Sequence, residues 1–353
     1  MNIKPFILMS VVLFFIVSLC LESGCTQQAS HAKKENNRLQ KRIQGDPLEN
    51  LSDNIEVLTY FGERADVSPD NSRIAFMSKT FGDAMVIDVQ TRKITCLTCN
   101  VPGAAFLRVM HLPTGDYILI GPEHFENISE SKKNSDLWYL SKVPGSRSVK
   151  IGQKVNEGIA VSKQSMKIAF TEAGAAKMSR LLVADLDISG DSAKLLHRQV
   201  VAENHDTTCT LEAQDFYDND TRMTFFCYVP KGLFEVKGVN LTNKMITNFS
   251  RAAGSFNEPE GIFPGNDYTT VESDRQCEWL GGERGSANLD IWKLKLDGTG
   301  KDFVRLTHFN DYEGGKAANP VVAANGRFMA FQVAKSTDPP GMGHGLLLYW
   351  FGK

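Results

Sequence analysis

A ten-residue pattern that recurs along the chain constrains the fold more than any other feature. Each copy begins with an apolar or aromatic residue, continues through a turn rich in Pro, Asp, Asn or Gly, and ends in an apolar strand, as in "VSPDNSRIAF" and "VAANGRFMAF". Such turn residues preset or cap the backbone between strands. Recurrence at a spacing of roughly 50 residues indicates a repeat architecture. The copies begin at residues 67, 111, 161, 216, 262 and 322.

The segment after each copy alternates apolar and polar residues around a second turn, for example at Gln90-Thr91 or Asp297-Gly298. This pattern is typical of a β-hairpin. Two hairpins per repeat give four strands, which is the blade of a β-propeller. The sequence therefore predicts an all-β, six-bladed propeller of four-stranded blades over residues 54–353.

The last repeat contains one strand too few, because the chain ends after "GHGLLLYWFGK". A strand-like segment at residues 55–60 precedes the first repeat and has no hairpin partner of its own. Pairing this segment with the last blade would close the ring and cover two exposed strand edges. We therefore expect the N-terminal strand to complete the sixth blade.

The N-terminus reads as an export signal over residues 1–25. Lys4 is followed by the apolar run "PFILMSVVLFFIVSLCL", which is at the low edge of the length of a membrane span. Ser23-Gly24-Cys25 resembles the end of a bacterial lipoprotein signal, although Glu22 departs from the family pattern. The resemblance implies lipidation at Cys25, with a cleaved signal without lipid and an uncleaved anchor as alternatives. Residues 26–53 are polar and predict a tether.

Charge and cysteine content limit the partners. A formal net charge of −2 gives no electrostatic argument for nucleic acid as a partner.

In an exported chain, cysteine pairs tend to oxidise. Cys96 with Cys99 and Cys209 with Cys227 are the candidate disulfides, and Cys277 is left over. Cys96 and Cys99 could also be half of a zinc site, but no second pair with metal-ligand spacing accompanies them, so no metal site is predicted.

The repeats resemble those of the TolB-like propellers of the bacterial cell envelope. The resemblance rests on "VSPDNSRIAF", "NPVVAANGRFMAFQ" and the outer hairpin "NLDIWKLKLDGTGKDFVRLTHF". It implies an exported protein in the periplasm or outer membrane that receives a partner at the axial channel. TolB itself carries an α/β domain before its propeller, and this chain has only polar residues there, so a TolB role is not carried over.

Residues just before each repeat should approach the axial channel. They include carboxylates in three successive blades, opposed by basic residues from the others, with Asp66, Asp215, Glu258 and Asn319 nearby. This arrangement predicts a site for a cationic ligand, a metal or a sugar. The alternative is that the channel opening is polar only because it is filled with water, and that it binds no ligand. The candidate ligand-binding residues are Arg64, Arg108, Glu157, Glu212, Glu260, Lys316 and His344.

These features favour a binding or scaffold module for a protein, peptide or carbohydrate, anchored to the membrane through lipid and monomeric. A sensory or assembly component that receives a peptide is a related alternative. The runner-up is a metal-dependent polysaccharide-active enzyme similar to oligogalacturonate lyase, whose clustered histidines find no match here. Neither G-x-S-x-G nor H-E-x-x-H is present, so no catalytic residue is assigned. No cofactor is predicted, and a divalent cation is left open.

Overall fold

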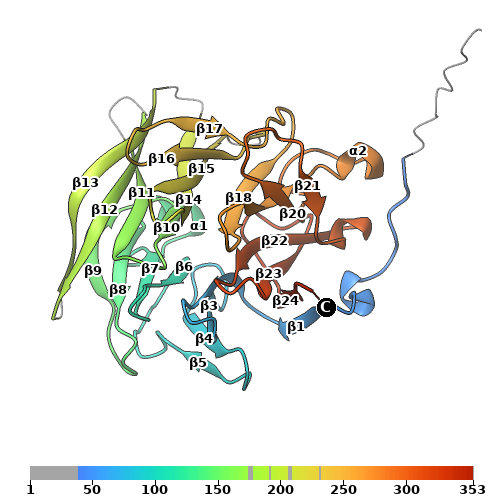
Figure 1. The fold of residues 1–353 in the computed structure, drawn as a ribbon. Coiled ribbons are helices and arrows are strands. Elements are labelled where there is room, and N and C mark those ends of the chain that lie inside the picture. Colours follow the sequence, from blue (N-terminus) through green and yellow to red (C-terminus); the bar gives the residue numbers. More distant parts are fainter. Residues whose placement is uncertain (1–38, 174–177, 191, 206–208, 230–231, 353) are drawn as a thin grey trace, which may run out of the picture. The chain divides into compact units, whose positions relative to one another are not determined.

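The computed structural model describes residues 39–173, 178–190, 192–205, 209–229 and 232–352. Within the unit formed by residues 38–353, six four-stranded antiparallel sheets make a six-bladed β-propeller (Figure 1). This confirms the predicted fold class. The signal segment and Cys25 lie outside the described residues, and their roles stay predictions. None of the helices in the described ranges is both long and apolar enough to cross a membrane.

The blades follow the chain in order, and each is built from four consecutive strands except the last. Blades 1 and 2 comprise β2 (Glu63–Val67), β3 (Arg73–Met77), β4 (Ala84–Asp88) and β5 (Ile94–Cys96), then β6 (Arg108–His111), β7 (Tyr117–Gly121), β8 (Asp136–Leu140) and β9 (Val149–Lys154). Blades 3 and 4 comprise β10 (Ile159–Val161), β11 (Lys167–Ala173), β12 (Ser179–Ser189) and β13 (Ser192–Asn204), then β14 (Thr210–Tyr217), β15 (Arg222–Tyr228), β16 (Lys237–Asn240) and β17 (Ile246–Asn248). Blades 5 and 6 comprise β18 (Asn257–Ile262), β19 (Tyr268–Ser273), β20 (Asp290–Lys295) and β21 (Phe303–Arg305), then β22 (Gly315–Val322), β23 (Phe328–Lys335), β24 (Leu346–Trp350) and β1 (Ile55–Thr59).

The ten-residue repeat is the turn between the first two strands of each blade. In blade 1, the Ser68 hydroxyl accepts the backbone N–H of Arg73 at 2.9 Å, and Asp70 accepts the N–H of Ser72 at 3.1 Å. Asn71 adopts a left-handed φ of 62°, which Asn tolerates better than most residues. The apolar end of the repeat, Ile74 to Phe76, is fully buried between blades. The recurring sequence is thus a turn that aims an apolar strand into the core.

Ring closure occurs as predicted. Strand β1 pairs antiparallel with β24, with Ile55 opposite Tyr349 and Val57 opposite Leu347. The sixth blade therefore contains three strands from the C-terminal end of the chain and one from its N-terminal side. This pairing removes an exposed edge from β24.

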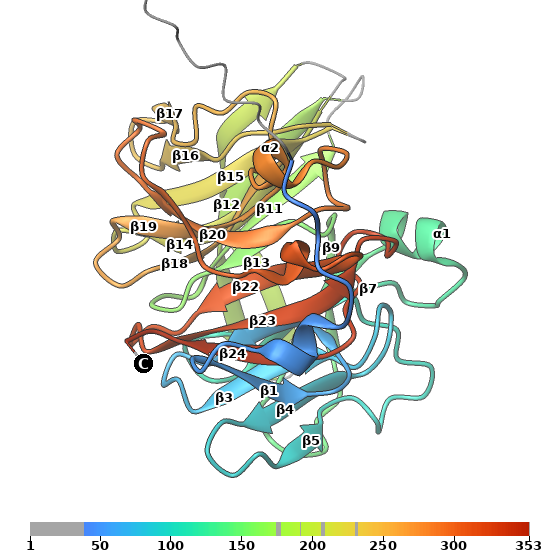
Figure 2. The same ribbon diagram turned by 90° about the vertical axis from the view of Figure 1, so that its right-hand side faces the viewer.

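Residues 39–53, expected to belong to a free tether, instead lie along blades 5 and 6 (Figure 2). The Arg42 guanidinium donates hydrogen bonds to the carbonyls of Asn310 and Gly281, both at 3.0 Å. Ile43 forms a parallel bridge with Tyr312, and a short 3-10 helix, η1 (Pro47–Asn50), leads into β1. The segment is therefore held against the propeller at Arg42 and Ile43, although most of its polar side chains are exposed to solvent.

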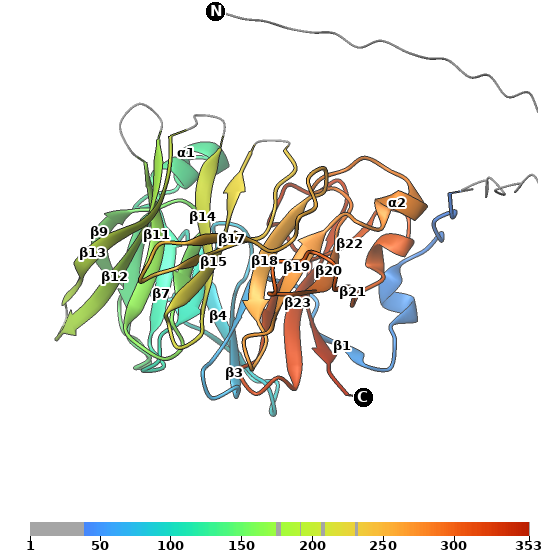
Figure 3. The same ribbon diagram turned by 45° about the horizontal axis from the view of Figure 1, so that its top comes forward.

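Two short helices lie in loops on one face of the ring. Helix α1 (Ile128–Lys133) connects β7 to β8, and α2 (Cys277–Leu280) connects β19 to β20 (Figure 3). Both loops join the second strand of a blade to the third. Because strands alternate in direction, these loops lie on the same face as the connections between successive blades. We call this the loop face.

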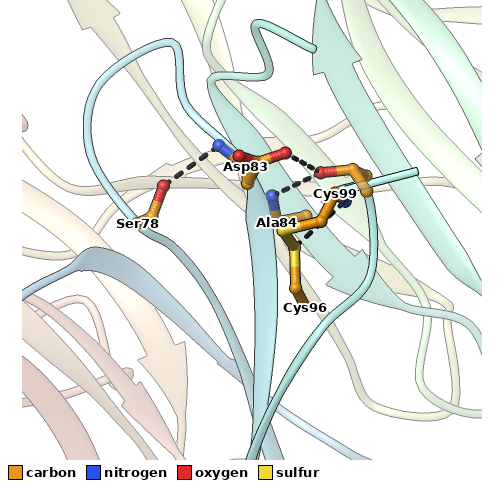
Figure 4. The surroundings of a disulfide bond; sticks show 6 residues. Ser78, Asp83, Ala84, Cys96 and Cys99 are labelled. Carbon is orange, nitrogen blue, oxygen red and sulfur yellow. Dashed lines mark hydrogen bonds between the residues drawn. A yellow bond between two sulfur atoms is a disulfide. The ribbon is translucent and has the colours of Figure 1, made fainter. Parts of the chain in front are cut away.

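Disulfides join the two pairs that the sequence put forward, Cys96 with Cys99 and Cys209 with Cys227. Cys277 is a buried free thiol. Near the first disulfide, the Thr98 hydroxyl donates to Asp83 at 2.8 Å and accepts the N–H of Ala84 at 3.0 Å (Figure 4). These bonds fix the end of blade 1's outer hairpin.

Candidate functional site

Two cavities lie at the centre of the ring, where the inner strands converge. The larger, of about 330 Å³, is rich in glutamates, and we call it the acidic cavity. The smaller, of about 70 Å³, receives residues from all six inner strands, and we call it the narrow cavity. Arg64, Arg108 and Asn319 line both, so these residues separate the two cavities. The acidic cavity also borders α1 through Lys132 and the β23–β24 loop through Gly341, which places it toward the loop face.

Strand register explains why glutamates gather in the acidic cavity. Glu212 stands opposite Phe226, and Glu258 stands opposite Glu272, in each case before a bulge in the inner strand. Glu212 and Glu258 both lie four residues before their repeat, as does Glu157. The position equivalent to Glu157 and Glu212 in blade 5 is therefore Glu258. Glu260, which the sequence analysis grouped with them, lies within the bulge and lines the narrow cavity.

Among the described carboxylates of the acidic cavity, Glu157 is the one with two ion-pair partners. The Arg64 guanidinium contacts its Oε2 at 2.7 Å, and the Lys132 ammonium forms an ion pair with its Oε1. Burial alone would raise the pKa of Glu157, but the two cations outweigh it and lower that pKa to about 2. Glu157 is thus a fixed negative charge at neutral pH.

Glu212 is in the opposite situation. No donor among the described residues forms a hydrogen bond or close ion pair with its carboxylate, although the side chain lines the acidic cavity. Burial, with the nearby charge of Glu157, raises the pKa of Glu212 to about 8. The carboxyl therefore holds a proton more tightly than an ordinary glutamate and would ionise most readily beside an added cation.

The other three glutamates form one group around Asn319. The Gln214 amide donates to Glu258 at 3.2 Å, the Asn319 amide donates to Glu260 at 3.4 Å, and the Asn319 backbone N–H donates to Glu272 at 2.5 Å. Burial raises the pKa of all three carboxyls, that of Glu260 to about 8, and repulsion from neighbouring glutamates adds to it for Glu258 and Glu260. The nearby cations offset this effect only in part.

Arg108 is the principal cation shared by these glutamates. Its charge lowers the pKa of Glu212, Glu258 and Glu260 against the larger effect of burial. No hydrogen bond or ion pair of its guanidinium is found within the described part of the chain, and its Nε is buried without a partner. Lys316 donates instead to the carbonyl of Ser286 at 3.2 Å.

Asp66, which lines the narrow cavity, is well paired. Asp66 accepts the backbone N–H of His111 at 2.7 Å, contacts its Nδ1 at 2.8 Å and pairs with the Lys163 ammonium at 2.6 Å. Burial would raise the pKa of Asp66, but Lys163 and His111 hold it below its usual range. Asp215 occupies the equivalent position in blade 4 and accepts the N–H of Ile262 at 3.2 Å, and burial raises its pKa to about 7.

The structure brings six of the seven candidate residues together around the two cavities. The exception is His344, whose Nε2 contacts Asp338 at 2.9 Å beside a different depression. Sequence reasoning did not single out Glu272, Lys132 and Lys163 for the site. Glu272 could have been found from its strand position opposite Glu258, whereas Lys132 comes from an inserted helix that carries no repeat signal.

One group of potential metal ligands occurs among the described residues, and it lies outside the channel. Asp83, Cys96 and Cys99 offer ligand atoms within 4.8 Å of one another (Figure 4). The two sulfurs are joined as a disulfide, so they are not thiolate ligands in this state.

Comparisons with known proteins agree with the fold. No family model and no curated protein matches the sequence. A protein of Agrobacterium tumefaciens assigned as TolB has a TM-score of 0.51 at 15% identity, over 71% of this chain and 77% of that one. TolB from Acinetobacter baumannii has a TM-score of 0.45 at 14% identity, over 75% of this chain and 61% of that one. Hydrazine synthase from Kuenenia stuttgartiensis has a TM-score of 0.48 at 12% identity, over 79% of this chain and 77% of that one. The chain is therefore a β-propeller protein whose structural neighbours include TolB.

Proposed function

We propose that the protein is a binding or scaffold module of the cell envelope that takes a protein, peptide or carbohydrate ligand into the acidic cavity. The observation that carries the proposal is Glu212, whose carboxyl group has no hydrogen-bond or ion-pair partner among the described residues and lines a cavity of about 330 Å³. That volume is within the range of ligand sites. A ring that served only as a spacer would be more stable with an apolar residue at this position.

The absence of a recognised catalytic motif in the sequence makes binding the simpler role. Propellers with the same fold serve many functions, so the proposal rests on the cavity and its side chains. The envelope location rests on the N-terminal apolar run and on Ser23-Gly24-Cys25. Under this proposal the propeller is held at a membrane through lipid on Cys25.

The binding role is tested by thermal unfolding of the protein with spermidine, oligosaccharides and short peptides. At least one compound class should raise the unfolding temperature through preferential binding to the folded state. Ser286 lines the acidic cavity, so Ser286→Trp should fill it and abolish the shift without changing its charge. A shift that survives Ser286→Trp, or no shift with any class, would contradict binding in this cavity.

The membrane anchor has a separate test. A palmitate analogue should label the wild-type protein in cells and leave Cys25→Ser unlabelled. Equal labelling of both proteins would remove the lipid anchor from the proposal and leave the cavity unaffected.

A further inference from the structure

We infer that the acidic cavity receives a lysine or arginine side chain of a protein partner that docks on the loop face. This inference rests on the proposed function and names the chemistry of its ligand. It depends on four features of the site: its charge balance, an unpartnered acceptor, an aromatic wall and an apolar rim.

The charge balance of the channel leaves room for one more cation. Arg64 and Lys132 are occupied by Glu157. Lys316 lies near Glu272, whose carboxylate also accepts a backbone N–H. The remaining carboxyls belong to three glutamates, and Arg108 is the cation with the largest effect on the pKa of each. They are Glu212 and Glu258 of the acidic cavity and Glu260 of the narrow cavity. A cation entering the acidic cavity would displace a proton from Glu212 or Glu258 and pair with the carboxylate that forms.

An unpartnered acceptor points to the same kind of ligand. Asn319 is 9% exposed and lines both cavities, and none of the described residues forms a hydrogen bond with its Oδ1. A buried amide oxygen without a donor is costly unless a ligand or water supplies one. Its amide nitrogen already faces Glu260 at 3.4 Å. Asn319 therefore offers an acceptor beside the glutamates, as an ammonium or guanidinium requires.

The aromatic wall suits an organic cation. Phe226, Tyr228 and Phe256 line the acidic cavity next to the glutamates, and Phe226 stands directly opposite Glu212 in the sheet. Aromatic faces attract lysine and arginine side chains and also pack against their methylene stems. A wall of this kind would add little to the binding of a hydrated metal ion.

A single metal ion also fits the geometry poorly. Cation ligation needs several oxygens within bonding distance of one point. Among the described residues, no three carboxylate, thiol or imidazole groups of the channel converge to within 4.8 Å. The glutamates are instead spread around a cavity of about 330 Å³, which suits a larger cation that bonds them through several N–H groups.

The rim indicates that the cation belongs to a protein. Loops that contribute to the cavity also carry exposed apolar side chains: Ile128 precedes Lys132 by one helical turn and is 53% exposed, and Met342 follows Gly341 and is 38% exposed. Tyr60, 82% exposed, lies just before the inner strand that carries Arg64. Exposed apolar groups around a charged pocket are typical of protein interfaces. A free polyamine would not use this rim.

The test compares two libraries of end-capped peptides with random apolar neighbours around one fixed residue. The fixed residue is lysine in one library and Nε-acetyl-lysine in the other. The full-length protein should retain the lysine library, and selected members should bind about tenfold more tightly than their acetylated counterparts, the effect of a hydrogen-bonded charge. Glu212→Gln with Glu258→Gln should remove this difference, whereas Glu49→Gln, on the exposed η1 segment, should not.

Each of the other possible results would overturn the inference or one part of it. Equal binding of both libraries, lost in Ser286→Trp, would retain the proposed function and overturn the cationic ligand. Retention of neither library, or a lysine preference that persists in the double glutamine variant, would overturn the inference. Spermidine binding without peptide binding would show a cation site and overturn the protein partner.

Discussion

Asp66 of the narrow cavity and Glu212 of the acidic cavity are channel carboxyl groups with opposite surroundings. In the narrow cavity, Asp66 is bonded to His111 and Lys163, and these partners hold its pKa below the usual range. In the acidic cavity, Glu212 has no such partner, and burial raises its pKa to about 8. Both side chains come from the inner strands of their blades, just before a repeat.

This difference separates stabilising charges from charges available to a ligand. Asp66 joins blade 1 to blade 2 through the backbone of His111, so its charge helps to hold the ring together. Glu212 joins nothing and lowers the stability of the unliganded protein when it ionises. The two carboxyl groups should also give the free energy of unfolding opposite dependences on pH, and these can be measured.

Removing the Asp66 carboxylate should have the largest effect. Asp66→Ala leaves the His111 N–H and the Lys163 ammonium without their acceptor, and we expect the free energy of unfolding to fall by about 3 kcal/mol at pH 7. Guanidinium unfolding measures this loss. Because the pKa of Asp66 is lowered in the folded state, its contribution is present above its ordinary value and is lost as the pH falls.

The matched control is Asp215→Ala in blade 4. Asp215 makes one backbone hydrogen bond to the next blade, and its pKa is raised to about 7, so the loss should be less than half as large. Equal losses for the two variants would remove the distinction between a paired and an unpaired aspartate.

Glu212→Gln should change stability in the opposite direction. The folded protein holds the Glu212 proton up to about pH 8, whereas the unfolded chain loses it near 4.5, so the wild type loses stability as the pH rises between these values. The variant should therefore be more stable by about 1 kcal/mol or more at pH 9 and nearly unchanged at pH 4. Charged or titratable groups near Glu212 are Arg64, Arg108, Lys132, Glu157, Tyr228 and Glu258.

Thermal unfolding of Glu212→Gln across this pH range gives the comparison. A variant that is less stable than the wild type at pH 9 would show that Glu212 has a stabilising partner. Glu49→Gln serves as the exposed control and should change the free energy of unfolding by no more than about 0.5 kcal/mol at any pH.

Among the channel variants, Arg108→Met should have the smallest effect on stability. It removes a cation that partly offsets the glutamates, so their pKa should rise further and the free energy of unfolding at pH 8 should fall by about 1 kcal/mol. The same change should tighten binding of a lysine peptide, since the ligand would replace the missing charge. Weaker peptide binding, measured by calorimetry, would mean that Arg108 contacts the ligand itself.

The sequence alone was sufficient for the fold. The turn that begins at Ser68-Pro69 and the buried Ile74–Phe76 run are local patterns, and each copy acts within one hairpin. The count of strands also predicted that β1 would complete the last blade, because an unpaired strand at each end of the chain is stable only when the two meet.

The site was predictable only in part. Repeat positions brought Arg64, Glu157 and Glu212 to the channel, because equivalent residues of successive blades face one axis. Glu260 was grouped with Glu157 in place of Glu258, although Glu258 lies at the same four-residue distance from its repeat as Glu157 and Glu212. The bulge at Glu260 is seen only in the structure.

Only the tertiary structure decided which charges are paired. Lys132 reaches Glu157 from a helix inserted in another blade, and Arg42 reaches the carbonyls of Asn310 and Gly281 from a segment that looks like a free tether. These contacts join residues far apart in the chain, and no local pattern records them. The sequence by itself determined six blades and an acidic, charged channel, because hydrogen-bonded turns and alternating strands are local. The partners of each charge depend on distances between blades, and those distances also determine that Glu212 is left unpaired.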